Sequence, residues 1–198
     1  MLSTNTLKPL SQSIKHQTEV QHLALEDLIV PQIQAVQSIE DYARLLNLFY
    51  GYNKPVEEAI KKIIGAAILP DIKKRQKADL ILSDLESLGL TLQPLISTSI
   101  PFIHTLEQAF GALYVLEGST LGGKSITQLL LKTKIELQPQ NMQFFTAYGK
   151  ETGPMWMTFL NHFNTFAAEY QQRVIIETAN ETFLKFKLWI QQQAPQVR

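Results

Sequence analysis

Residues 111–125 read Gly-Ala-Leu-Tyr-Val-Leu-Glu-Gly-Ser-Thr-Leu-Gly-Gly-Lys-Ser, and this stretch decides the fold class of the chain. Residues 118–125 match G-x-x-x-x-G-K-[ST], the pattern of a phosphate-binding loop, and residues 112–116 are apolar enough to form the strand that precedes such a loop. The same residues also fit one long helix, on which Gly118, Gly122 and Gly123 leave backbone accessible to a flat ligand or to a neighbouring helix. The first interpretation requires a parallel sheet with crossover helices, whereas the second requires an all-α protein.

The rest of the chain favours the all-α interpretation. Apolar residues recur at helical spacing, and no run of alternating apolar and polar residues is bounded by hairpin turns. No linker divides the pattern, so we expect a single domain over residues 1–198 with its core at about residues 10–193. The predicted helices are 11–29, 38–64, 71–88, 105–132, 155–166 and 169–193.

Prolines and capping residues set the predicted boundaries. Pro31 should end the first helix at residue 29, and Pro55 should kink or split the second. Ser38 and Asp41 have the spacing of a capping box at the start of that second helix. Gly89 is placed to end the helix at 71–88 as a C-terminal cap.

Composition excludes several classes of protein. Lys and Arg together number 18, as do Asp and Glu, and this zero net charge argues against a nucleic-acid binder. The chain has no cysteine, which excludes disulfides and thiolate ligation of a metal and fits a reducing cytoplasm. Residues 1–8 are polar and lack the apolar core of a signal peptide. No apolar run approaches the ~20 residues of a membrane span. We therefore expect a cytoplasmic protein.

The phosphate-loop interpretation fits its surroundings poorly. More than a hundred residues of helical pattern precede the motif, where a P-loop would follow the first strand of a sheet. No apolar strand ending in aspartate follows to hold magnesium. On a helix, each interior glycine costs on the order of 1 kcal/mol relative to alanine. Three glycines within six residues therefore need a reason, which is either close helix packing or contact with a ligand.

His22 stands out among the four histidines by its position. It lies on a helical stripe at steps of four, four, three and four residues, which turns the imidazole inward. The stripe consists of Ile14, Thr18, His22, Leu25 and Ile29. Glu26 follows one turn later and could hold the second ring nitrogen of a metal-bound imidazole. Lys15 precedes His22 by two turns, roughly 10 Å along the axis, where it could meet an anionic group of a ligand. The alternative is a histidine that only fills the core.

These residues resemble those of the haem oxygenase family. Residues 15–26, Lys-His-Gln-Thr-x-x-x-His-x-x-x-Glu, resemble the proximal helix of that family, and residues 118–123 resemble the distal helix. Residues 111–123 are especially similar to the bacterial branch associated with phytochrome photoreceptors. The likeness runs from about Leu10 to Ile190 and includes Phe49-Tyr50-Gly51, Pro55, Glu57, Tyr148-Gly149, Thr152-Gly153, Trp156 and Thr182-Phe183.

The resemblance implies a fold, a reaction and a site. His22 would be the iron ligand, supported by Glu26, with Lys15 and Thr18 on the same helix and Phe183 as a wall of the pocket. Gly118, Ser119, Gly122 and Gly123 would lie on the other face of the haem. The implied reaction uses O2 and external electrons to cleave haem, which is both cofactor and substrate, to biliverdin, carbon monoxide and ferrous iron. The implied electron donor is a ferredoxin, a flavodoxin or a reductase.

Two departures from the family pattern leave alternatives open. Ser119 stands where many members carry an aspartate, and Leu160 and Asn164 stand where animal members place basic residues. A non-catalytic haem binder of the same fold is one alternative. A nucleotide-binding protein that depends on Lys124 is the other.

Overall fold

The computed structural model describes residues 9–91, 95–167 and 169–193, and helices are the only regular elements in these residues. The polar stretch at residues 1–8 and parts of the predicted single domain lie outside them. The elements are α1 Leu10–Gln34, α2 Ile39–Lys61, η1 Ile72–Arg75, α3 Ala78–Ser87, α4 Leu106–Leu130, η2 Pro139–Asn141, α5 Gln143–Thr146, η3 Gly149–Glu151, α6 Thr152–Phe166 and α7 Glu169–Gln193. The all-α prediction is confirmed.

The stretch at residues 111–125 lies entirely within α4. The described residues form no strand, so no parallel sheet exists among them to carry a phosphate-binding loop. The P-loop interpretation, and with it a nucleotide site at Lys124, is therefore wrong. None of the described helices is long and apolar enough to cross a membrane.

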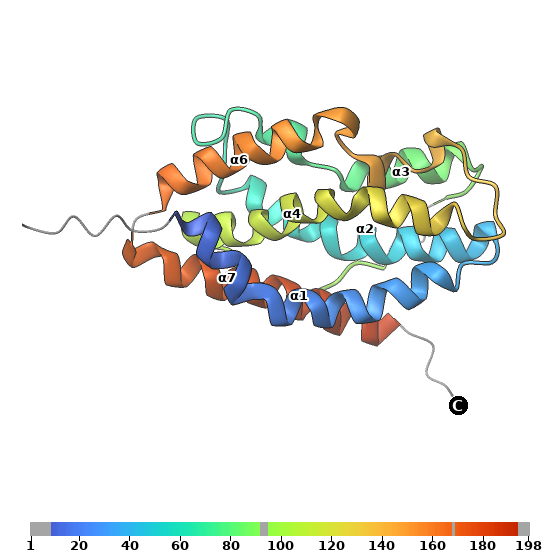
Figure 1. Cartoon of the computed structure of the whole chain (residues 1–198), viewed down its shortest axis with the longest axis horizontal. Helices are drawn as coiled ribbons and strands as arrows, with labels where there is room; N and C mark the ends of the chain where they lie inside the picture. Colours follow the sequence, from blue (N-terminus) through green and yellow to red (C-terminus); the bar gives the residue numbers. More distant parts are fainter. Residues whose placement is uncertain (1–8, 92–94, 168, 194–198) are drawn as a thin grey trace, which may run out of the picture.

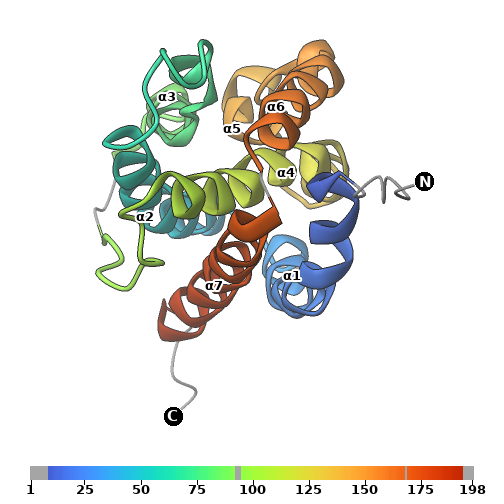
Figure 2. The ribbon, with the colours of Figure 1, turned by 90° about the vertical axis from the view of Figure 1, so that its left-hand side faces the viewer.

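Helix α4 runs through the middle of the bundle, with α1 and α7 on one side and α6 on the other (Figures 1 and 2). Its residues 109–117 are all buried. Gly111 allows α7 to approach closely, because a Cβ at this position would lie 2.4 Å from the carbonyl oxygen of Ile175. Helix α1 is tied to the C-terminal part of the chain, since Ser11 N donates to Asn164 Oδ1 at 3.0 Å. Gln17 O likewise accepts from Asn180 Nδ2 at 3.1 Å.

Capping residues account for three helix ends. Ser38 and Asp41 form the predicted capping box, with each backbone N–H donating to the other side chain at 3.0 and 3.1 Å. Thr105 and Gln108 form a second capping box at the start of α4. Gly89 follows α3 with a φ of +69°, the left-handed conformation that glycine adopts at a helix end without strain.

Two predicted boundaries are wrong. Pro31 lies inside α1, which continues to Gln34, whereas Pro55 lies inside α2 without splitting it. A proline removes one backbone bond, and burial of Ile33 beyond Pro31 holds the extra turn of α1 in place. The helix predicted at 71–88 is two elements, because the Glu57 carboxylate accepts the N–H groups of residues 77 and 78 and so starts α3 there.

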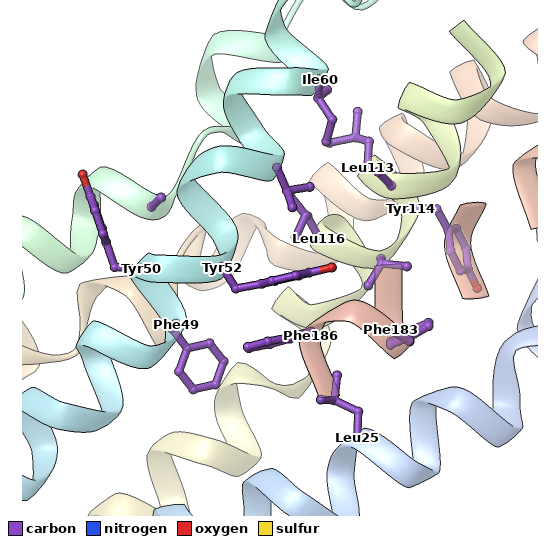
Figure 3. Packing of buried hydrophobic residues seen from close by; sticks show 14 of the residues in the cluster. Leu25, Phe49, Tyr50, Tyr52, Ile60, Leu113, Tyr114, Leu116, Phe183 and Phe186 are labelled. Atoms are coloured by element: carbon purple, nitrogen blue, oxygen red, sulfur yellow. The ribbon is translucent and has the colours of Figure 1, made fainter. Parts of the chain in front are cut away.

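Aromatic rings fill the core between α2 and α7 (Figure 3). The rings of Tyr52 and Phe186 stack at 4.6 Å between centroids, and Phe49 meets Phe186 edge to face at 5.4 Å. The buried Tyr52 hydroxyl donates to Thr182 O at 2.6 Å. The stacked and edge-to-face rings pack α7 against α2.

Candidate functional site

His22 interrupts an otherwise buried stripe of α1. The other four residues of the stripe are buried, whereas 51% of the His22 side chain is exposed. The prediction that the imidazole turns inward is therefore corrected, because the side chain is half-exposed. A histidine that only fills the core would be covered, so His22 is accessible to a ligand.

Two side chains meet the His22 imidazole. Its Nε2 lies 3.6 Å from Glu26 Oε1, one turn along α1. Its ring meets Phe183 of α7 edge to face, with 5.5 Å between centroids. A carboxylate beside one ring nitrogen can hold that nitrogen while the other binds a metal. The structure thus brings together three of the predicted site residues.

The remaining predicted residues of α1 differ in accessibility. Lys15 is exposed on the same face as His22, two turns earlier. Thr18 is buried, and its hydroxyl donates to Ile14 O at 2.8 Å. The hydroxyl is thus covered and bonded within its own helix, and the ligand-binding role of Thr18 stays a prediction.

The three glycines of α4 differ in what they face. A Cβ added to Gly122 would meet nothing within 4 Å, and one added to Gly118 would come no closer than 3.8 Å to the Trp156 ring. A Cβ added to Gly123 would lie 1.9 Å from the Phe145 carbonyl oxygen. Gly123 therefore packs closely against the backbone of α5, and the ligand-facing role expected of it stays a prediction. Gly122 is the bare position.

Ser119 is exposed on α4 between these glycines. Its hydroxyl donates to Leu116 O at 2.7 Å. The hydroxyl proton is therefore used within the helix, and only the oxygen lone pairs can accept a hydrogen bond from another group. Asn164 is also engaged, since its side chain bonds both the backbone and the hydroxyl of Ser11.

Sequence reasoning missed a buried ionic cluster behind α4. The Glu117 side chain is fully buried and pairs with Arg75 and Lys77, which are also buried. Tyr148 donates to the same carboxylate at 2.9 Å. Burial and the Glu117 charge both raise the pKa of Tyr148, which keeps the phenol protonated. The available signal was one acidic residue at the end of the apolar run 109–116.

Comparisons with known proteins agree on one family. The family model described as "Heme oxygenase" matches residues 8–192. No curated protein matches the chain. The NO- and CO-bound heme oxygenase of Neisseria meningitidis has a similar structure, with a TM-score of 0.78, 21% identity and coverage of 94% of this chain and 92% of that one. The heme oxygenase of Leptospira interrogans gives a TM-score of 0.73 and 14% identity, over 93% of this chain and 100% of that one. The chain belongs to the haem oxygenase family, whose members degrade haem.

Proposed function

We propose that this haem oxygenase binds haem between α1 and α4 and cleaves it to biliverdin, carbon monoxide and ferrous iron, using O2 and external electrons. The observation that carries the proposal is the half-exposed His22 beside Glu26 and Phe183. The bare backbone at Gly122 lies on a neighbouring helix. Haem supplies the iron at which oxygen is activated, and the chain supplies a ligand and a shaped surface.

His22 is the proposed ligand of the iron. A neutral imidazole binds iron through one nitrogen, and a carboxylate at the other nitrogen fixes the ring orientation and raises its basicity. Glu26 lies where it can do this without leaving its own helix. Phe183 packs against the imidazole edge and restricts its rotation. Lys15 is proposed to pair with a haem propionate, because it is exposed on the same face of α1.

Gly118 and Gly122 are proposed to face the opposite side of the haem. Without side chains at these positions the backbone can approach a flat ring closely and leaves little space for free water. Ser119, whose proton is engaged by Leu116, is proposed to accept a hydrogen bond from a water on this side. A water held there would lie close to the site of proton transfer.

Three further assignments accompany this proposal. We infer a separate electron donor, such as a ferredoxin, a flavodoxin or a reductase, since the chain lacks the cysteines that ligate most iron–sulfur clusters. We place the chain in the phytochrome-associated bacterial branch, which residues 111–123 support by their likeness. We also infer a cytoplasmic location and a single domain over residues 1–198.

A non-catalytic haem binder of this fold is the second candidate. It is favoured by the Ser119 hydroxyl, which donates within α4, and by Asn164, which is held by Ser11. Both groups are thereby less able to act on a ligand. The two candidates share haem binding through His22 and differ in turnover.

The test is a hemin titration of the wild type, His22→Ala and a matched control, His16→Ala. His16 lies on the same helix and also faces a glutamate, with Nδ1 3.5 Å from Glu19 Oε2, but is 87% exposed. The wild type and His16→Ala should give a stoichiometric Soret band, and His22→Ala should not. With reductant and catalase under air, the band should decay to a biliverdin spectrum.

Each other outcome decides against part of the proposal. A stable Soret band without decay would identify a haem binder. Equal titrations of His22→Ala and the wild type would exclude His22 as the ligand. Absence of stoichiometric binding in the wild type would refute haem binding altogether.

A further inference from the structure

The carboxylate of Glu117 lies at the centre of the buried ionic cluster, one residue before Gly118 in α4. Its Oε1 accepts from Lys77 Nζ at 2.5 Å and from the Tyr148 hydroxyl at 2.9 Å. Its Oε2 pairs with Arg75 Nη1. Three of the roughly four lone-pair sites of this carboxylate are therefore directed at two cations and a phenol.

The partners of Glu117 come from separate parts of the fold. Arg75 belongs to η1, Lys77 precedes α3, and Tyr148 precedes η3. Arg75 also binds the Asp71 carboxylate at 2.8 and 2.6 Å, and its Nη2 donates to Met155 O in α6 at 3.2 Å. One side chain of α4 thus holds together segments that are distant in the sequence.

The surface of α4 around Gly122, called the bare surface below, has no side chain that could hold the helix in one rotation about its axis. Gly122 has no side chain and no neighbour within 4 Å of its Cβ position, so nothing at this position resists rotation of the helix about its axis. Gly122 lies about 140° around the helix from Glu117, since each residue advances about 100°. The cluster therefore holds the side of α4 that is roughly opposite to the bare surface.

The cluster is a stiff restraint because of its burial. The Glu117 and Arg75 side chains are fully buried, and the Lys77 side chain is 6% exposed. A rotation of α4 that withdrew Glu117 would leave the buried Lys77 without a carboxylate and Arg75 with Asp71 alone, which is more costly than loss of an exposed ion pair.

We propose that Glu117 is a positioning residue that fixes the rotation and depth of α4, and so sets how closely the backbone of Gly118 and Gly122 approaches the haem. Tyr148 and Lys77 hold Glu117 in this role. The inference rests on the proposed function. It assigns to the cluster a task in the reaction rather than in stability alone.

The experiment compares Tyr148→Phe and Glu117→Gln with a matched control, Tyr52→Phe. Each tyrosine variant removes one phenol hydroxyl, but Tyr52 donates to Thr182 O in α7 and does not touch α4's cluster. Hydrogen exchange of the backbone amides at residues 118–124 is measured without haem. Hemin affinity, the pH midpoint of the ferric complex's spectrum and the rate of Soret decay are measured with haem.

Tyr148→Phe should exchange faster at residues 118–124 and shift the pH midpoint of the ferric complex, with hemin affinity unchanged within about twofold. The decay rate should fall about tenfold, because displacements of under an ångström at a reacting group cost on this order. Glu117→Gln should show larger changes of the same kind. Tyr52→Phe should leave exchange at residues 118–124, the midpoint and the rate at wild-type values.

The positioning role is refuted if Tyr148→Phe matches Tyr52→Phe in all of these measurements, even where Glu117→Gln fails to fold. The exchange measurement separates this inference from the proposed function. If the wild type binds no haem, the proposed function fails, while faster exchange in Tyr148→Phe alone would still support control of α4 by the cluster.

Discussion

The adjacent glycines Gly122 and Gly123 should respond in opposite directions to the same substitution. Gly122→Ala adds a methyl group to a position with nothing within 4 Å, so only helix propensity changes in the haem-free protein. The free energy of unfolding should rise by about 1 kcal/mol, the difference between glycine and alanine inside a helix. Gly123→Ala gains the same propensity but places its Cβ 1.9 Å from Phe145 O.

The size of the Gly123→Ala effect follows from the nature of the obstacle. A Cβ and a carbonyl oxygen cannot approach so closely, and the obstacle is backbone, so α4 and α5 must separate by more than an ångström. Overpacking typically costs about 1–3 kcal/mol, and a rigid neighbour places this site at the upper end. After the gain in propensity, a net loss of about 2 kcal/mol remains.

Thermal unfolding of the haem-free proteins, followed by far-ultraviolet circular dichroism, measures both effects. For a chain of this length, Gly122→Ala should raise Tm by about 3 °C and Gly123→Ala should lower it by about 6 °C. Although it is the more stable protein, Gly122→Ala should bind hemin less tightly than the wild type in a titration, since its methyl group occupies the proposed haem surface. Shifts of Tm in the same direction for both variants would refute the assignment of one glycine to a bare surface and the other to packing.

Two further predictions concern Asp84 and Ser119. Burial raises the pKa of Asp84 to about 6, although Gln143 N and Phe144 N donate to its carboxylate. Because this pKa is raised, the wild type should lose about 3 kcal/mol of stability relative to Asp84→Asn as pH rises from about 4 to above 6. Urea unfolding of both proteins at the two ends of this range tests the change, and a constant difference would contradict it. Ser119→Ala should leave hemin affinity unchanged and slow Soret decay about fivefold, the equivalent of one water hydrogen bond, in single-turnover assays. An unchanged rate of Soret decay would contradict the proposed role of Ser119 in the site.

Helix α7 shows how much of the fold the sequence predicts. Its predicted and observed range is the same, 169–193, because apolar residues at helical spacing continue without a proline. The errors arise where distant residues intervene. Glu57 starts α3 from another helix, and burial of Ile33 carries α1 past a proline. The spacing of residues along one segment does not reveal contacts with residues that are distant in the sequence.

The site was predictable to a similar extent. The spacing of His22 and Glu26 along one helix fixed their proximity in advance, since residues four apart share a face. The contact with Phe183 required the packing of α7 on α1. The cluster at Glu117 joins residues about 40 positions apart, and Gly123 differs from Gly122 only through its neighbour in α5. Neither could be derived from one helix at a time.

The attachment of α1 to the end of the chain determines when the haem site can form during synthesis. Ser11 bonds to a residue 153 positions later, and Gln17 to one 163 positions later. Helix α1 is made before the other described helices, but its main packing partner, α7, follows last among them. Such contacts between distant residues form slowly and leave apolar surface exposed to chaperones meanwhile. Haem loading at the proposed site is therefore expected only after α7 has been made and has packed on α1.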